Sequence, residues 1–311
     1  MKKFFATIAV LALASAMVFA QDLASVTELY NSAATALSSD ENENALKSFQ
    51  EALTQAEALG EDGVEIANNC KGVIPSLALK IAKNFVKASD FDSAITKLGE
   101  AKALAEKFEA LDVVDEISDL LPQVLLSKGN GLLTAKNYAG AAEIYQQILG
   151  EDATNGMAAL RLGQALNASG KADEAIAAFE QAAANGQQAN AVKQLANINL
   201  KKAANALKEK KYADAIAAAL KTTEYDEDNS QAYQIAAQAS QLSNKNNDAI
   251  KYFEKYLEIA PDAKNAGQIA YTVGALYQQA KNVAKAKEFY QKASTDAKYG
   301  AEAKKLLDAL K

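Results

Sequence analysis

Apolar residues with helical spacing, interrupted by short polar stretches, recur along the whole chain. Leu162–Leu166 is mostly apolar or small, Asn167–Gly170 is polar or small, and Asp173–Phe179 places apolar residues at helical spacing again. Apolar positions three and four residues apart predict one buried face on each of two helices. Apolar runs with the period of two that is typical of strands are absent from the sequence. The pattern therefore predicts helix, turn, helix, and an all-α fold.

The same template recurs seven times. A small residue on the first helix precedes a small residue on the second helix by twelve positions, and a large apolar residue usually follows four positions later. The seven pairs are Ala33 with Ala45, Ala82 with Ala94, Gly129 with Ala141, Gly163 with Ala175, Ala203 with Ala215, Ala237 with Ala249, and Gly274 with Ala286. The residues four positions later are Phe49, Leu98, Tyr145, Phe179, Ala219, Phe253 and Tyr290. Chance pairs in an alanine-rich chain are the alternative, but seven pairs in series with polar turns between them favour an array of helical hairpins.

This pattern resembles the tetratricopeptide repeat, a family whose unit of 34 residues packs two helices closely through small residues. Ala141 and Ala175 are 34 residues apart. The segment from Ser230 to Ala263 resembles the family most fully, with Pro261 closing the unit. The resemblance implies a right-handed superhelical solenoid of antiparallel helix hairpins, in which stacked neighbours form one continuous core.

The spacing of the repeats is longer near the N-terminus, where Ala45 and Ala94 are 49 residues apart. We therefore expect two longer units first and five regular units after them, and whether the longer units are true members of the family stays open. The predicted division is a signal peptide over residues 1–20, two longer units over 21–121, five units over 122–300 and a C-terminal capping helix over 301–311.

Two prolines and the chain end complete the prediction of elements. Pro75 and Pro122 lie 47 residues apart, and each suits the first turn of a new helix, where a missing N–H costs nothing. Residues 301–311 place Ala303, Leu306 and further leucines on one side and lysines elsewhere, which is the pattern of a helix that closes a core.

The first twenty residues have a different composition. Lys2 and Lys3 precede an almost continuous apolar stretch from Phe4 to Phe19, and small Ala20 precedes Gln21. These are the three parts of a secretory signal peptide. An uncleaved anchor is the alternative, but the stretch is shorter than the roughly 20 residues that a membrane span needs. No cysteine lies at the cleavage site, so we expect an exported periplasmic or secreted protein that is not a lipoprotein and has no transmembrane span in its mature chain.

The composition excludes several kinds of chemistry. The chain has no histidine, one cysteine (Cys70) and one arginine (Arg161), which excludes histidine catalysis, disulfides within the chain, cysteine-rich zinc sites and arginine clusters. The net charge of −6 without a basic stripe argues against binding of nucleic acid. The acidic run Asp226–Asn229 lacks the glycine of a calcium loop, since Gln231 occupies that position. We expect no catalytic residues, no metal and no cofactor.

In repeats of this family the first helix of each hairpin lines a groove. Amides at i, i+3, i+7 and i+10 share one helix face, and they offer both donors and acceptors to the backbone of an extended peptide. A neutral, solvated helix face is the alternative interpretation. The predicted groove residues are Asn130, Gln164, Asn167, Asn197, Gln231, Gln234, Gln238, Gln241, Gln268, Tyr271 and Gln278.

Together these features predict a scaffold or adaptor that binds other proteins or peptide segments outside the cytoplasm, with envelope complexes as candidate partners. One alternative is a binding module for a glycan or cell-wall fragment, which would need exposed aromatic platforms such as Tyr271. The second alternative is an enzyme, which the missing histidine disfavours.

Overall fold

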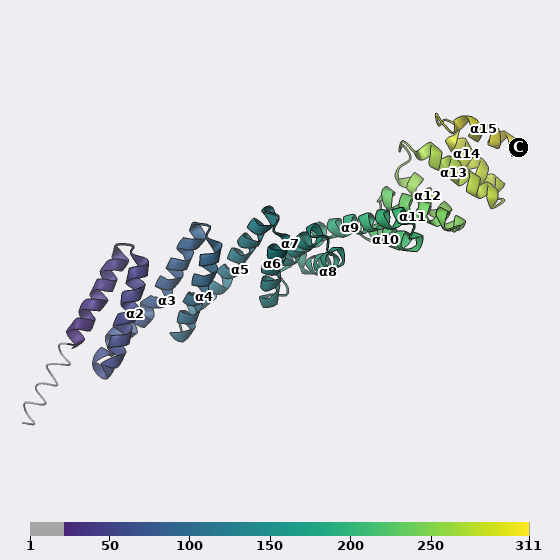
Figure 1. Ribbon diagram of the computed structural model, residues 1–311. Coiled ribbons are helices and arrows are strands. Elements are labelled where there is room, and N and C mark those ends of the chain that lie inside the picture. The colour runs from purple at the N-terminus through teal and green to yellow at the C-terminus, as the bar shows by residue number, and fades with distance from the viewer. Residues whose placement is uncertain (1–21, 311) are drawn as a thin grey trace, which may run out of the picture. The chain divides into compact units, whose positions relative to one another are not determined.

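The computed structural model describes residues 22–310, and all regular structure in this part of the chain is helical (Figure 1). The first helix covers residues 22–38. The helices that follow are α2 (Asn42–Ala58), α3 (Val64–Lys87), α4 (Phe91–Lys107), α5 (Leu111–Thr134), α6 (Tyr138–Glu151), α7 (Gly156–Ala168), α8 (Ala172–Ala182), α9 (Gln188–Lys208), α10 (Tyr212–Tyr225), α11 (Ser230–Leu242), α12 (Asn246–Ile259), α13 (Ala266–Gln279), α14 (Val283–Ala293) and α15 (Gly300–Ala309). The expected signal peptide, residues 1–20, lies outside the described residues.

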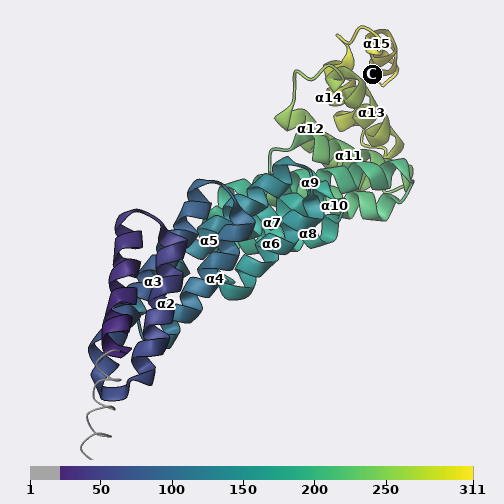
Figure 2. The same cartoon turned by 60° about the vertical axis from the view of Figure 1, so that its left-hand side comes forward.

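Consecutive helices pack against each other as hairpins, as the pairs α3–α4 and α13–α14 show in two views (Figures 1 and 2). The seven hairpins each contain one of the predicted pairs of small residues. Packing divides the chain into two compact units, Met1–Ile148 and Leu149–Lys311. The predicted all-α fold of stacked helix hairpins is therefore confirmed.

The hairpins share one arrangement of core residues. In every hairpin the predicted small residue of the first helix is buried, and so is the residue four positions after the small residue of the second helix. The small residues of the second helices are all alanines with no exposed surface: Ala45, Ala94, Ala141, Ala175, Ala215, Ala249 and Ala286. The predicted packing positions therefore lie in the core of all seven hairpins.

The hairpin of α9 and α10 differs from the others in the size of its side chains. Ala203 and Ala215 are fully buried, as in the other hairpins, but the residue four positions after Ala215 is Ala219, which is also fully buried. An alanine fills less space than the rings of Phe253 or Tyr290, which follow Ala249 and Ala286. The position is thus part of the core even where it does not carry a large side chain.

A ring fills the space where the first small residue is glycine. A Cβ built on Gly163 would lie 2.7 Å from the ring of Phe179. Gly129 and Gly274 meet tyrosine rings in the same way. Helix packing this close requires the residue without a side chain.

Pro261, which we expected to close the unit from Ser230 to Ala263 and to pack between repeats, is exposed and does not lie in the core. It directly follows Ala260, the C-cap of α12. A proline suits this place because it cannot continue the helix. Its contribution is to end the helix rather than to fill the core.

The turn inside each hairpin has the same backbone conformation. The residue seven positions after the first small residue has a positive φ in all seven hairpins: Asp40, Ser89, Lys136, Gly170, Lys210, Asn244 and Lys281, with φ between 59° and 85°. At Lys210, its N–H donates to the carbonyl of Leu207 and the next N–H donates to that of Ala206, at 3.0 and 2.9 Å. This left-handed residue with its pair of backbone hydrogen bonds ends the first helix.

The prediction that Pro75 and Pro122 begin new helices is wrong. Pro75 lies inside α3 and Pro122 lies inside α5, and both helices have 24 residues. A proline in a helix interior costs about 3 kcal/mol. In α3 this cost is offset by burial on both sides of the proline, because the core residues of this helix pack with those of α2 and of α4. The boundary placed between residues 121 and 122 falls within α5, so the third hairpin begins at Leu111.

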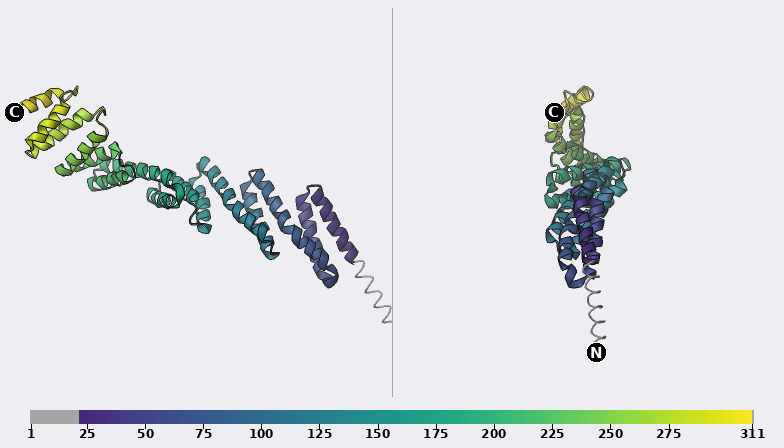
Figure 3. Two further views of the ribbon diagram at one scale, coloured as in Figure 1. Left: turned by 180° about the vertical axis from the view of Figure 1, so that it is seen from behind. Right: turned by 90° about the vertical axis from the view of Figure 1, so that its left-hand side faces the viewer.

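The predicted C-terminal capping helix is α15. Its Ala303 is fully buried in the last core cluster, and Leu306, Leu307 and Leu310 pack against that cluster. Figure 3 shows this yellow helix beside the last hairpin from a third direction. Among the described helices, none combines the length and the apolar character that a membrane crossing requires.

Candidate functional site

Helix α11 carries the predicted row of glutamines on one face. Asn229 caps this helix by accepting a hydrogen bond from the N–H of Ala232 at 3.0 Å. The opposite face is buried in the core, with Ile235 and Ala236 among its residues. Four glutamines remain on the outside, two exposed and two half-buried, and we call them the amide face: Gln231, Gln234, Gln238 and Gln241.

No hydrogen bond within the described residues uses the side-chain amides of this face. Each glutamine therefore offers one acceptor and two donors outward. The amide face can pair with the N–H and C=O groups of an extended chain, while its neutral charge excludes strong selection by charge.

A groove of about 420 Å³ adjoins the amide face. It lies between the C-terminal end of α9, the first turn of α10 and the last turn of α11, and we call it the α9–α11 groove. Its lining is Leu207, Lys208, Lys210, Tyr212, Gln238, Gln241 and Leu242. Leu242 is 58% exposed, one of five large apolar side chains exposed in the described part of the chain. The groove thus combines apolar side chains, two lysines and amides at one place.

The groove residues other than Gln238 and Gln241 were not predicted from the sequence. Leu207 and Leu242 are separated by 35 positions, and only the packing of α9 beside α11 brings them together. The one signal in the sequence was Leu242 itself, an apolar residue directly after Gln241 at the end of a polar helix face.

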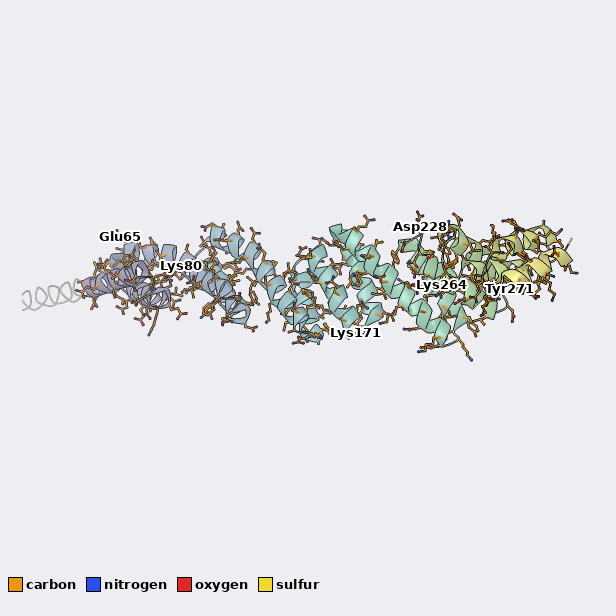
Figure 4. The ribbon with its side chains drawn as sticks, turned by 90° about the horizontal axis from the view of Figure 1, so that it is seen from above. Glu65, Lys80, Lys171, Asp228, Lys264 and Tyr271 are labelled. Atoms are coloured by element: carbon orange, nitrogen blue, oxygen red, sulfur yellow. The ribbon has the colours of Figure 1, made fainter. Side chains whose placement is uncertain are left out.

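The predicted residues on α13 take part in contacts within the protein. The ring of Tyr271, labelled in Figure 4, lies 5.8 Å from that of Tyr290 and 5.4 Å from that of Tyr299. Tyr290 Oη donates to Oε1 of Gln278 at 2.6 Å. Gln268 is exposed. Tyr271 therefore packs at a tilt against two other tyrosines rather than standing alone as a platform, and Gln278 accepts a hydrogen bond from the hydroxyl of buried Tyr290.

Two further predicted groove residues have similar internal roles. Oε1 of Gln164 accepts from Arg161 Nη1 at 3.0 Å, and Oδ1 of Asn130 accepts from the buried Tyr145 hydroxyl at 2.9 Å. Asn167 and Asn197 are exposed. None of these four asparagines and glutamines lines the α9–α11 groove. The structure thus joins Gln238 and Gln241 in one concave site and leaves the others on their own helices.

The acidic residues and the cysteine of the described part bear on metal binding and on thiol chemistry. No group of three acidic residues or cysteines there is arranged to hold a metal ion. Cys70 is fully buried, and burial raises the pKa of its thiol to about 11. A thiol with this pKa is protonated at neutral pH and is a poor nucleophile.

Two segments of the chain match models of the tetratricopeptide repeat. One match covers residues 132–198, from the end of α5 into α9. The other covers residues 230–263, which are α11, α12 and the turn after them. Residues 230–263 are also the bounds of the unit that resembles the family most fully in sequence. A comparison with curated protein sequences gave no match.

Several solved structures resemble the chain at low identity. MamA is 18% identical over 56% of this chain and 96% of its own, with a TM-score of 0.33. YrrB, described as a TPR protein with an unusual peptide-binding site, is 19% identical over 58% and 91%, with a TM-score of 0.34. The TPR2AB domain of yeast Sti1, described in a complex with pHSP90, is 16% identical over 77% and 97%, with a TM-score of 0.31.

The family assignment therefore rests on the two model matches and on the repeated geometry. All seven hairpins bury the same pair of positions, and all seven end their first helix with a left-handed residue at the same place. The chain carries tetratricopeptide repeats at residues 132–198 and 230–263.

Proposed function

We propose that the protein is a binding scaffold that holds an extended segment of a partner protein along the amide face, with an apolar side chain of that segment in the α9–α11 groove. The observation that carries the proposal is the groove itself, where exposed Leu242 lies beside Gln238 and Gln241. The protein acts through binding and not through catalysis.

The two parts of the site have different tasks. An apolar side chain that enters the groove removes the surface of Leu242, Leu207 and Tyr212 from water, which supplies affinity at roughly 25 cal/mol per Å². The amides pair with the backbone of the segment, which satisfies its polar groups without requiring one sequence. Such a site selects a segment by its extended shape and by one apolar anchor.

The same proposal places the protein outside the cytoplasm. Its support is the sequence of residues 1–20, with two lysines, an apolar stretch and Ala20 before Gln21. Partners then belong to the periplasm or the secreted space, and envelope complexes are the first candidates. The intact mass of protein from native envelope extract tests this: a chain that begins at Gln21 supports export with cleavage, and a chain that retains Lys2 and Lys3 contradicts it.

The binding site is tested by photo-crosslinking in envelope extract. A photoreactive amino acid replaces Gln238 in one variant and Lys251, which is exposed on α12, in a control. We expect a distinct crosslinked partner from position 238 and no enrichment of that partner from position 251. Equal capture from both positions would contradict a site on the amide face.

Two substitutions then separate the parts of the site. Changing Gln234 and Gln238 together to alanine keeps a good helix former and should weaken capture by about 1–3 kcal/mol through two lost hydrogen bonds. Leu242→Ala should weaken capture by about 1–2 kcal/mol through lost apolar contact. Val283→Ala is the matched control, because Val283 is 44% exposed and lies outside the groove. Unchanged capture by both groove variants would leave the amide face as solvated surface.

A further inference from the structure

The α9–α11 groove has a positively charged border that binding of an apolar anchor does not require. Lys208 and Lys210 line the groove together with the apolar side chains of Leu207, Tyr212 and Leu242. Both lysines are exposed, and the lining contains no aspartate and no glutamate. The border of this groove is therefore basic, although the whole chain has a net charge of −6.

Neither lysine of the border is neutralised by a carboxylate of the protein. Glu209, which lies between them in the chain, has its Oε2 atom 2.8 Å from Nζ of Lys211. Among residues 22–310, no ion pair includes Lys208 or Lys210. Two ammonium groups thus remain available to a negatively charged ligand at the groove.

The sequence of α9 extends this positive charge away from the groove. Residues 181–208 contain no aspartate and no glutamate. Lys201 is exposed and precedes Lys208 by seven residues, which is about two turns of the helix. The two side chains therefore share one exposed face of α9, and nothing acidic on this helix opposes them.

The backbone holds the border in a fixed place beside the apolar part of the groove. Lys210 is the left-handed residue of its turn, with a φ of 60°. Its N–H donates to the carbonyl of Leu207 at 3.0 Å. The flexible four-carbon stem of lysine then lets the ammonium group move to meet a charge near the groove.

The geometry of an extended segment determines which of its residues can meet these lysines. Successive side chains of an extended chain point to opposite sides, and each residue advances the chain by about 3.3 Å. The residues two positions before and after an apolar anchor therefore point to the same side as the anchor, about 7 Å from it. A carboxylate at either position would lie at the border of the groove.

We propose that the segment bound in the α9–α11 groove is acidic, with an aspartate or glutamate two positions from its apolar anchor that pairs with Lys208 and Lys210. This inference rests on the proposed function, because it requires an apolar side chain in the same groove. The amide face binds the backbone of the segment without regard to charge, and the two lysines select its side chains. A segment with lysine or arginine at these positions is repelled.

The test uses the full chain, labelled with ¹⁵N at glutamine, and two capped heptapeptides without terminal charges. The acidic peptide is Ser-Glu-Ser-Leu-Ser-Glu-Ser, and the neutral peptide is Ser-Gln-Ser-Leu-Ser-Gln-Ser. The reporters are the side-chain amide signals of Gln238 and Gln241, each assigned by its loss in an alanine variant. At low ionic strength the acidic peptide should bind with a Kd about fivefold lower, since exposed ion pairs contribute modestly. At about 1 M salt, where the screening length is about 3 Å, the difference should disappear.

Two variants of the border test the assignment to these lysines. Lys208→Gln/Lys210→Gln should bind the two peptides with equal Kd. The ratio of the two Kd values is the readout, so a general loss of affinity does not imitate this result. Lys208→Glu/Lys210→Glu should reverse the preference and favour a third peptide, Ser-Lys-Ser-Leu-Ser-Lys-Ser, over the acidic one.

Lys136→Gln/Lys281→Gln is the matched control for the loss of two positive charges. Lys136 and Lys281 are exposed, have the same left-handed turn position in two other hairpins and lie outside the groove. This variant should keep the fivefold preference for the acidic peptide. Loss of the preference in the control would assign it to the total charge of the protein and overturn the inference.

The outcomes separate the inference from the function on which it rests. Equal binding of the acidic and neutral peptides by the unchanged protein would overturn the inference and leave an apolar anchor site in place. A preference that survives Lys208→Gln/Lys210→Gln would also overturn it. Absence of any shift at Gln238 and Gln241 with all three peptides would contradict the proposed function, and the inference with it.

Discussion

At the scale of single residues, three of the seven hairpins depend on a contact that leaves no room for one extra carbon atom. The ring of Phe179 lies directly against the backbone of Gly163, so α7 and α8 approach more closely than any side chain at position 163 would allow. Tyrosine rings play the same part at Gly129 and Gly274, and their hydroxyls reach Asn130 and Gln278. Large rings and absent side chains are therefore complementary parts of one contact.

The first prediction concerns this contact. Gly163→Ala should destabilise the protein by about 1–3 kcal/mol, because the new methyl group must displace Phe179 in a packed core. Gly131→Ala is the control: Gly131 is exposed in α5, and a Cβ there meets nothing within 4 Å. Denaturant melts followed by circular dichroism should show a loss for the first variant and no loss for the second. Equal stability of both variants would show that the ring adjusts freely.

The second prediction concerns Cys70. Because burial holds its thiol protonated with a pKa of about 11, the native protein should react with a disulfide reagent at pH 8 at least tenfold more slowly than the protein unfolded in urea. A colorimetric thiol assay in the two states measures this. Equal rates in both states would place the thiol at the surface.

At the scale of elements, the turns that join the helices of each hairpin show which residue types occupy a left-handed backbone position. Only one of the seven left-handed turn positions is glycine, Gly170, and one is asparagine. One is aspartate, and the other four carry lysine or serine, which adopt this conformation at a cost of about 1–2 kcal/mol. Packing of the two helices thus imposes the turn on residues that do not favour it.

The third prediction tests that cost. Gly170→Ala should destabilise the protein by about 1–2 kcal/mol, since nothing within 4 Å would touch the added Cβ and only backbone strain remains. Ser89→Gly should have the opposite sign, with a gain of up to about 1 kcal/mol after the flexibility of glycine in the unfolded chain is counted. Denaturant melts of both variants provide the measurement. The same sign for both variants would rule out the turn as the cause.

The elements also show which features can be predicted from a sequence. The pairs of small residues and the large residues after them identified all seven hairpins, because the residue type determines the volume of the side chain. The proline pattern was misleading: burial of α3 on both sides of Pro75 keeps the helix continuous, and burial by other helices is not visible along the chain. The left-handed turn conformation at Lys136 and Lys210 could not be predicted from the sequence either, because it is imposed by the packing of the two helices.

The candidate site was predictable only in part. Helical spacing placed the four glutamines of α11 on one face, and the structure shows that face outside the core. The groove beside it depends on Leu207 and Tyr212, which belong to another hairpin. Internal hydrogen bonds also use Asn130, Gln164 and Gln278. Such bonds depend on distances between helices, which the spacing of residues along one helix does not contain.

At the scale of the whole molecule, stability comes from packing between helices that are close to each other in the chain. Among the described helices, extensive packing joins elements that are adjacent in the chain or next but one, such as α9 with α10 and α9 with α11. In such an array the total stability is approximately a sum of terms from each repeat and each interface between repeats. A local change should therefore have a local effect.

The last prediction follows from this argument and uses the variant of the fourth hairpin. Hydrogen exchange read by mass spectrometry resolves opening along the chain. Gly163→Ala should speed exchange in α7, α8 and the helices next to them by roughly fivefold or more, the equivalent of about 1 kcal/mol of lost local stability. Residues 22–87, in the other compact unit, should keep their rates. A single cooperative domain would instead lose protection everywhere, because any destabilisation lowers the free energy of its one global unfolding step. As a control, Gly131→Ala should leave exchange unaccelerated in both units. Uniform acceleration by Gly163→Ala from the first helix to α15 would show that the repeats unfold together and that the nearest-neighbour description fails for this chain.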